Sequence, residues 1–241
     1  MIDWLRSASD DPTIAVGDAV LPVVIRRHPT ARRIVLRLAP DGSEVRLTMP
    51  RWGATREGLA FAESRREWLA QQLAAREPAR CPFAERSVDY RGAPLALDWQ
   101  RDAPRKPALF EGMLRLGGPE ETRMGRLRRW LEGQAVELME ADLADYCAAA
   151  GIAEVPPLRL SRAQRRWGSC SSKGMVRINW RLVQAPDHVR RSVVAHETAH
   201  LVHFDHSPAF HALLGDIFGP DLPRAESWLK ANGRSLYAAF G

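Results

Sequence analysis

The sequence predicts an α+β fold in which a small β-rich module, residues 1–118, precedes a mainly helical domain, residues 119–241. Three observations carry this prediction. Short segments of alternating apolar and polar residues, separated by turn signals, fill the first module. A long amphipathic helical pattern follows it. The last part combines a hairpin pattern with a helix that carries two histidines four residues apart, His196 and His200.

The N-terminal module begins with three strands and a helix. The turn signal Asp41-Gly42 separates the last two strands. The helix is expected at residues 55–76, with Thr55 as its N-cap. Alternation places the strands at residues 20–27, 32–39 and 44–49.

Two strand pairs complete this module. The first is joined by the turn signal Arg91-Gly92 and the second by Glu111-Gly112. The pairs are residues 87–90 with 95–100, and residues 108–110 with 113–116.

The second domain opens with a helix at residues 120–150, ended by Gly151. After the linker Pro156-Pro157, two strands are expected as a hairpin around a polar loop, followed by three helices. A helix, a hairpin and a histidine-bearing helix in this order form the minimal layout of a zincin. The strands are residues 158–161 and 176–180, the loop is 164–174, and the last two helices start at Pro208 and Leu222.

The helix after the hairpin carries an HExxH motif, His196-Glu197-Thr198-Ala199-His200. A helix brings residues four apart onto one face, so His196 and His200 can hold one cation. Glu197 lies roughly 100° further round, where its carboxylate can reach a water on that cation. Because HExxH also occurs by chance, the amphipathic flank that begins at Pro186-Asp187 is needed to support a zinc site.

The third ligand is expected to be His206, with His203 as the competitor. Ser207-Pro208 favours a break followed by a new helix, with Ser207 as N-cap and Pro208 at the first position. A turn before this break can bring His206 back to the cation. The spacing also matches the metzincin pattern. That pattern requires glycine where this chain has His203, and a methionine downstream, but no methionine follows Met175.

Composition limits the class of protein. The chain has 241 residues, a net charge of +6 and three cysteines without a CxxC pair. These features indicate a globular protein of a reducing cytoplasm, without a disulfide framework. No apolar segment is long enough to span a membrane, and the N-terminus lacks the apolar region of a signal peptide. The basic charge permits a nucleic-acid partner but supports it weakly.

Four linked segments resemble the YgjP-like predicted metal-dependent hydrolases, which are related to WLM proteins and to the SprT-like zincins. The resemblance covers the C-terminal half closely and the N-terminal strands more loosely. The segments are Arg166-Trp167-Gly168-Ser169-Cys170-Ser171, Arg177-Ile178-Asn179-Trp180-Arg181, His196-Glu197-Thr198-Ala199-His200-Leu201 and His206-Ser207-Pro208-Ala209-Phe210.

The resemblance implies a gluzincin-like fold with one Zn²⁺ held by His196, His200 and His206, and with Glu197 as general base. Members of the family usually carry tryptophan where this chain has His211. This departure does not affect the three metal ligands, but it changes the expected wall of the pocket. His211 either supports a metal ligand from outside or is a partly exposed residue of the helix.

The segment around Gly168 allows a structural or a functional reading. Gly168 permits an unusual backbone angle. Arg166, Ser169 and Asn179 are candidates for binding substrate or supporting the metal histidines. Arg177 is expected to share a strand face with Asn179 and Arg181, and this row of guanidinium groups would suit an anionic substrate or merely face solvent. Cys170 is not expected to act as a nucleophile.

The predicted function is that of a zinc metallopeptidase in which Glu197 activates a zinc-bound water to cleave a peptide bond. The resemblance also leaves open a nucleoside triphosphate (UTP) pyrophosphohydrolase at the same metal site. A third possibility is a nucleic-acid-binding module with structural zinc. The intact Glu197 and the presence of only three visible ligands argue against this last one, because structural zinc sites are closed by four.

Overall fold

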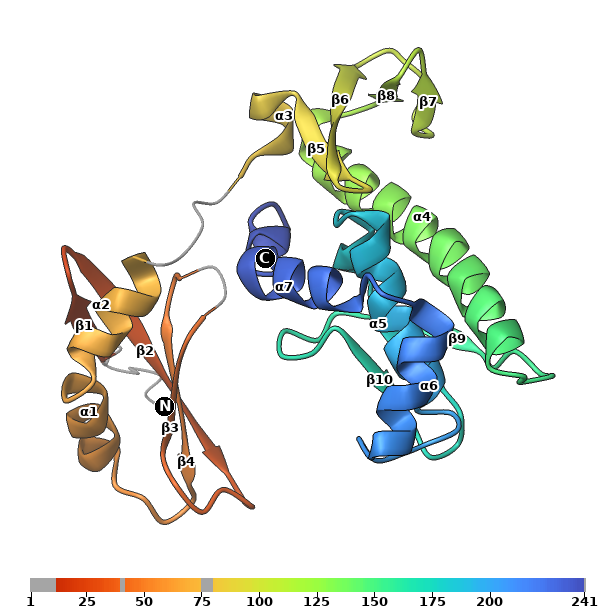
Figure 1. Cartoon of the computed structure of the whole chain (residues 1–241). Helices are drawn as coiled ribbons and strands as arrows, with labels where there is room; N and C mark the ends of the chain where they lie inside the picture. The colour runs from red at the N-terminus through yellow and green to blue at the C-terminus, as the bar shows by residue number, and fades with distance from the viewer. Residues whose placement is uncertain (1–11, 40–41, 75–79, 241) are drawn as a thin grey trace, which may run out of the picture. The chain divides into compact units, whose positions relative to one another are not determined.

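The computed structural model describes residues 12–39, 42–74 and 80–240. The chain forms two compact units, Met1–Ala79 with Gly241, and Arg80–Phe240. The described residues contain seven α-helices and three small mixed sheets, which confirms the predicted α+β class (Figure 1). The division between the units falls at residues 79 and 80, whereas the sequence suggested a boundary between residues 118 and 119.

The sheet of the first unit has the strand order β1-β2-β4-β3. Its two central strands run parallel, and each outer strand is antiparallel to its neighbour. The sequence predicted three of these strands but not the first, which has only four residues. Its buried side chains, Ile14 and Val16, belong to the core of this unit. The strands are β1 (Thr13–Val16), β2 (Ala19–His28), β3 (Val35–Leu38) and β4 (Val45–Pro50).

The helix expected at residues 55–76 is two helices, α1 (Thr55–Glu63) and α2 (Arg66–Ala74), and residues 75 and 76 lie outside the described part. The hydroxyl of Ser64 donates to the carbonyl of Phe61 at 2.8 Å, a local bond that favours an interruption. Thr55 is not the N-cap. That position is Ala54, and the Thr55 hydroxyl instead accepts a hydrogen bond from Arg27 at 2.8 Å.

The first sheet of the second unit follows a short helix, α3 (Pro82–Glu85), and has the order β5-β6-β8-β7. This arrangement repeats the first unit: two hairpins joined by a parallel pairing of their second strands. The sequence showed no repeat, because the two sheets share connectivity rather than residue pattern. The strands are β5 (Ser87–Tyr90), β6 (Ala93–Gln100), β7 (Ala108–Phe110) and β8 (Met113–Gly117).

Contacts with the histidine-bearing helix explain why this sheet belongs to the second unit. At the β5–β6 turn, Gly92 has φ +83°, and a Cβ there would lie 2.7 Å from Pro186. The neighbouring Arg91 donates to the carboxylate of Asp187, and its backbone N–H donates to Val183 at 2.8 Å. The predicted turn signal therefore also serves as a contact with the start of the helix that carries His196.

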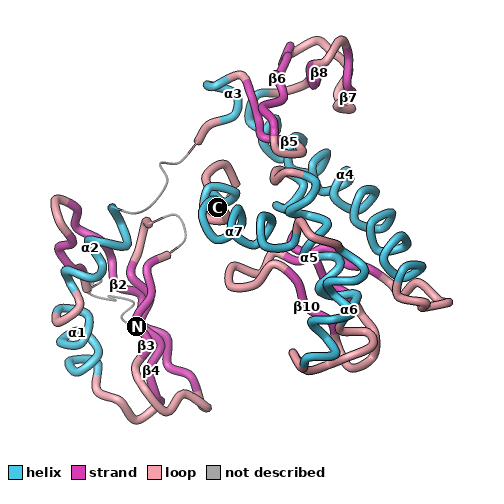
Figure 2. Tube along the Cα trace, viewed as in Figure 1, coloured by secondary structure: helices cyan, strands magenta, loops and turns pink. Residues whose placement is uncertain are grey.

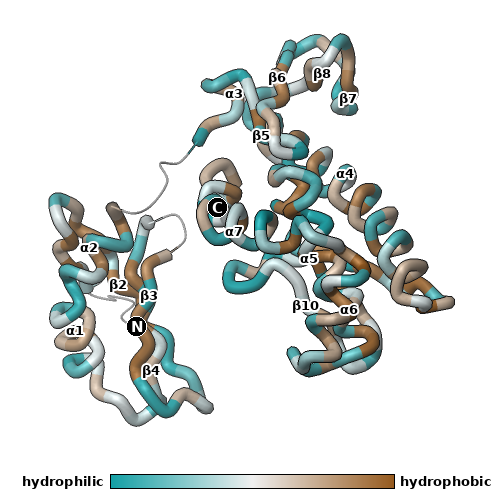
Figure 3. Tube along the Cα trace, in the orientation of Figure 1, coloured by the Kyte–Doolittle hydropathy of each residue, from teal (hydrophilic) through white to brown (hydrophobic). Residues whose placement is uncertain are grey.

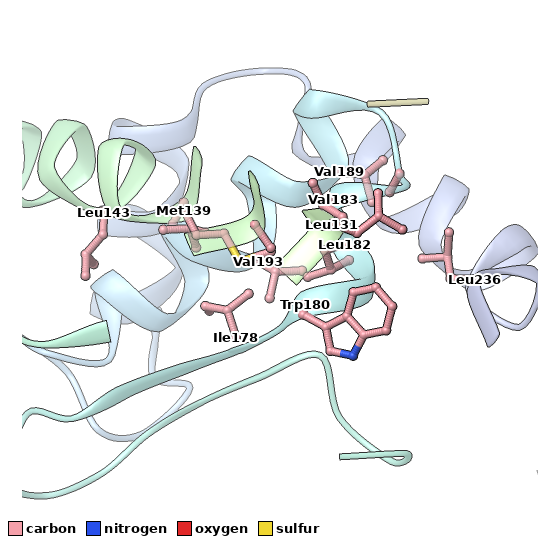
Figure 4. Close-up of a cluster of buried hydrophobic side chains, with 14 of the residues drawn as sticks. Leu131, Met139, Leu143, Ile178, Trp180, Leu182, Val183, Val189, Val193 and Leu236 are labelled. Atoms are coloured by element: carbon pink, nitrogen blue, oxygen red, sulfur yellow. The ribbon is translucent and has the colours of Figure 1, made fainter. Parts of the chain in front are cut away.

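A thirty-residue helix, α4 (Glu120–Ala149), forms the long side of the second unit and ends before Gly151, whose φ is +70°. Hydrophobic and hydrophilic residues alternate along it, as expected of an amphipathic helix (Figure 3). Figure 4 shows how its buried face, with Leu131, Met139 and Leu143, packs in one core with Trp180 and residues of the last strand and helices.

A buried ion pair links α4 to α5 (Asp187–Ala199). Asp142 on α4 accepts from Arg190 of α5 at 2.7 Å, and the two side chains are 4% and 3% exposed. Arg191 also reaches Asp142, at 3.1 Å. Arg190 additionally pairs with Asp187 at the start of its own helix. Each charged side chain of this group therefore has an oppositely charged partner, as buried charges require.

The third sheet contains β9 (Leu158–Ser161), β10 (Gly168–Cys170) and β11 (Val176–Asn179) in the order β10-β11-β9. Figure 2 labels β10, the outer strand of this sheet. The sequence prediction of a hairpin between β9 and β11 was wrong, because these strands run parallel. The antiparallel partner of β11 is β10, within the expected polar loop. Its three residues are too few and too polar to show a strand pattern. As the outer strand, β10 has only one neighbour in the sheet.

Short helices complete the second unit. The strand expected at residues 176–180 ends at Asn179, and a 3₁₀ helix, η1 (Trp180–Val183), follows. The remaining elements are α6 (Pro208–Phe218), α7 (Leu222–Asn232) and the 3₁₀ helix η2 (Ser235–Tyr237). Within the described ranges, no helix has both the length and the apolar character to cross a membrane.

Candidate metal centre

Two imidazoles of the centre come from one turn of α5. The helix starts at Asp187 after Pro186, as predicted, and His200 forms its C-cap. The ring centroids of His196 and His200 are 4.8 Å apart. The buried side of α5, which includes Val189 and Val194, fixes the helix in the core. The pair therefore sits on a rigid element.

The third imidazole returns after a break in the helix. Ser207 is the N-cap of α6 and accepts from the Phe210 backbone N–H, and Pro208 occupies the first turn, as the sequence predicted. His206, directly before this cap, has its Nε2 at 3.2 Å from Nε2 of His196. One ligand atom from each of His196, His200 and His206 lies within 4.8 Å of the others. The structure thus brings together the three predicted ligands.

His203 has a different position from the one a ligand needs. Its backbone carbonyl lies 3.0 Å from Nδ1 of His200. If Nδ1 carries the proton and donates it to this carbonyl, Nε2 of His200 keeps its lone pair for a cation. His203 therefore contributes through its main chain, by orienting a neighbouring ring, and it is not part of the three-histidine group.

Phe210 forms the floor of the site. It is completely buried, and its ring centroid lies 5.0, 4.6 and 4.8 Å from those of His196, His200 and His206. Sequence analysis did not assign it a role. The sequence did contain a signal for this position: Phe210 lies three residues after the N-cap Ser207, in the first turn of a helix that begins directly after His206. His211 is exposed, with its ring 6.3 Å from that of His206.

The charge state of the imidazoles suits a cation. Burial, together with repulsion from His200, His206 and His211, lowers the pKa of His196 to about 4. His196 is therefore neutral at physiological pH, and its lone pair is not blocked by a proton. Three imidazole nitrogens form a donor set that suits zinc and other borderline transition metals, so the residues present fit a metal ion.

Glu197 is buried beside this group, with only 5% of its surface exposed. Burial raises the pKa of its carboxyl to about 7, while the Arg166 guanidinium and the backbone N–H of Cys170 favour the ionised form. A carboxyl with this pKa can exchange a proton near neutral pH, as general acid–base chemistry requires. Burial and, to a smaller extent, the Glu197 carboxylate raise the pKa of the Cys170 thiol, which disfavours a nucleophilic thiolate.

Gly168 is explained by close approach rather than by backbone angle. Its φ is not positive, so the unusual backbone angle that glycine permits is not used here. A Cβ at Gly168 would lie 2.6 Å from Cγ and 2.7 Å from Cδ of Glu197. Only glycine allows the outer strand β10 to run this close to the carboxyl group.

The remaining candidates separate into two groups. Asn179 is fully buried, and its amide donates to the carbonyl of Ala163 at 2.7 Å and to the Tyr237 hydroxyl at 3.1 Å. It therefore fixes the loop before β10. Arg181 lies in η1 rather than on a strand and is buried over the Tyr237 ring at 4.5 Å. The expected row of guanidinium groups does not form, because the strand ends at Asn179.

The other residues of the segment lie nearer the surface. Arg177 is exposed on β11, and Ser169 is half-buried on β10, opposite Arg177 in the antiparallel register. Arg166 is exposed in the loop before β10, and its charge acts on Glu197. Of the predicted substrate-binding arginines, Arg166 is therefore the one that is electrostatically connected to the centre.

Comparison with known proteins gives one match. A family described as YgjP-like, metallopeptidase domain, matches residues 32–232. This range covers most of the chain and includes all three histidines and Glu197. Neither curated proteins nor solved structures give a match.

Proposed function

The chain belongs to the YgjP-like family of metallopeptidase domains, and from this premise we propose that it is a zinc-dependent hydrolase that cleaves peptide bonds. The observation that carries the proposal is the convergence of three imidazoles beside a buried carboxyl whose pKa is about 7. Only three histidines form this group among the described residues, which leaves room for water or substrate, as in catalytic zinc sites.

His196, His200 and His206 would hold the ion, and the carbonyl of His203 and the ring of Phe210 keep the imidazoles oriented. When bound, Zn²⁺ supplies Lewis-acid chemistry, by lowering the pKa of a water molecule and polarising a carbonyl group. Glu197 takes the proton of the attacking water and then delivers it to the leaving amine. Its pKa near 7 suits both transfers.

The outer edge of β10 supports a peptide as the substrate. The Asn179 N–H donates to the Trp167 carbonyl and the Ser171 N–H to the Met175 carbonyl, so residues 167, 169 and 171 direct their polar groups toward β11. In an antiparallel pair, Gly168 and Cys170 then direct theirs to the opposite side. The Cys170 N–H already donates a hydrogen bond to the Glu197 carboxylate. The Gly168 backbone is left to align an extended peptide by strand addition.

A hydrolysis screen tests the proposal. Zinc-loaded protein is incubated with denatured proteins, extended peptides and nucleoside triphosphates including UTP, and Glu197→Gln serves as the control. We expect cleavage of the polypeptides by the wild type only, while both proteins retain zinc. Hydrolysis of UTP that is lost in Glu197→Gln, without peptide cleavage, would support the pyrophosphohydrolase alternative. Polypeptide cleavage that persists in Glu197→Gln would exclude the assigned base.

A further inference from the structure

A pocket of about 270 Å³ opens beside the candidate base. One wall is the side of α5 that carries Val193, His196 and Glu197. A second wall consists of Trp167 and Gly168, at the start of the outer strand β10. The pocket is therefore continuous with the residues that would act on a scissile bond, and it lies next to the backbone that would align an extended chain. We call it the α7 pocket, after its third wall.

The third wall comes from one face of α7. Leu222, Glu226 and Leu229 line the pocket, and their spacing of four and three residues places them on the same side of a helix. The two leucines are half-buried, whereas Glu226 is exposed. Along this wall a solvent-exposed carboxylate thus stands between apolar side chains.

The tryptophan wall is held firmly. The Trp167 ring packs against that of Tyr237, with centroids 5.6 Å apart. The indole ring also approaches Gly233 so closely that a Cβ there would lie 3.0 Å from it. Tyr237 itself is anchored by Asn179, whose amide donates to its hydroxyl. The pocket therefore has a rigid apolar wall, which is suited to the stem of a long side chain.

The described side chains that line the α7 pocket include acids but no lysine or arginine. Two carboxyl groups, Glu197 and Glu226, line the pocket, and none of its described lining residues is lysine or arginine. Glu226 has no ion-pair partner among the residues that the structure describes. Its negative charge is therefore left for a ligand.

The geometry points to Glu226 as a specificity residue that selects a lysine or arginine side chain of the peptide substrate next to the scissile bond. This inference rests on the proposed function. The aliphatic stem of the side chain packs between Trp167, Leu222 and Leu229, and its cationic end meets the Glu226 carboxylate. Long basic side chains combine such a stem with a charged head that stays near water, which matches an exposed carboxylate beside an apolar wall.

The test uses cleavage-site profiles. Zinc-loaded protein digests denatured proteins, and mass spectrometry identifies the residues that flank each cut. We expect lysine and arginine to be enriched on one side of the bond. For a matched pair of peptides, Glu226→Gln should lower the ratio of kcat/KM for the arginine peptide over the leucine peptide by about fivefold, mainly through KM. Glu226→Lys should reverse the preference between basic and acidic residues.

Asp216→Asn is the matched control, because Asp216 is an exposed acid on α6 that does not line the pocket. It removes the same charge and should leave the profile unchanged. If wild type, Glu226→Gln and Glu226→Lys give the same profile, or if the wild type prefers acidic residues, the inference is overturned while peptide hydrolysis itself stands.

A binding experiment separates the inference from the proposed function. Zinc-loaded Glu197→Gln is titrated with fluorescent extended peptides that differ only by an arginine-to-glutamate exchange. Tighter binding of the arginine peptide, lost in the Glu197→Gln/Glu226→Gln double variant, supports the pocket assignment even if the wild type cleaves no polypeptide. Equal binding of both peptides, or binding of neither, overturns it.

Discussion

The carboxyl group of Glu197 occupies the space in which any residue other than glycine at position 168 would place its Cβ. A Cβ at Gly168 would lie 2.7 Å from Cδ of Glu197. This approach brings the backbone of β10 against the buried carboxyl, and the next residue but one, Cys170, donates its N–H to it. Glu197 can therefore take its observed position only because residue 168 of the Arg-Trp-Gly-Ser-Cys-Ser segment is glycine.

Gly168→Ala should therefore abolish hydrolysis while the protein still folds and binds zinc. The added methyl group must displace either the Glu197 side chain or the outer strand, and both positions matter for proton transfer. Activity, circular dichroism and metal content of the purified variant check this. Gly133→Ala is the control, because a Cβ at Gly133 meets no atom within 4 Å. Near-normal turnover in Gly168→Ala would show that the contact is not needed.

His206→Ala should weaken zinc binding by at least about a hundredfold, whereas His203→Ala should change it little. His206 offers a ring nitrogen to the group, but His203 contributes its backbone carbonyl, which alanine retains. Competition against a chromophoric chelator measures both affinities. The reverse result would transfer the third ligand to His203.

The metal histidines could be predicted because their positions depend on local rules. Helical spacing pairs His196 with His200, and the Ser207-Pro208 signal ends one helix and starts the next. Both rules act within a few residues of chain. The same holds for the Arg91-Gly92 and Glu111-Gly112 turns, in which all four residues have positive φ.

The errors concern contacts between distant segments. The sequence did not indicate β10 as a strand or the parallel pairing of β9 with β11, because these strands are placed by packing against distant helices: β9 against α4, and β10 and β11 against α5. Asn179 and Arg181 lie far along the chain from Tyr237, with which they form a buried cluster. Their polar side chains suggested a surface role, which burial against the C-terminal segment overrides.

Asp142→Ala should destabilise the second unit by about 3 to 5 kcal/mol, because it removes the buried carboxylate that pairs with the buried Arg190. Asp145→Ala is a matched control on the same helix. Asp145 pairs with Arg191 at 3.3 Å but is 63% exposed, so its loss should cost less than about 1 kcal/mol. Urea denaturation of both variants measures the difference. Equal effects would mean that the buried pair contributes no more than a surface one.

The stability of the metal-free protein should depend on pH through Glu197. The pKa of Glu197 is about 7 in the folded state, against 4.5 for a solvent-exposed glutamate, which represents the unfolded chain. Below the lower value both states hold the proton. As the pH rises toward 7, the unfolded state loses its proton first, so the folded state becomes progressively less stable. Above pH 7 both states are ionised, and the stability that the protonated carboxyl contributed is fully lost.

The difference between the two pKa values corresponds to about 3 kcal/mol. Glu197→Gln cannot ionise, so in EDTA it should gain about this much stability relative to the wild type between pH 4.5 and pH 8. Urea denaturation of both proteins across this range isolates the effect, since other titrating groups are common to both and cancel in the comparison. Parallel stability curves would mean that the folded protein does not disfavour the ionised carboxyl. The expected divergence would show that the position of this base is maintained at a cost in stability, which a bound cation would offset.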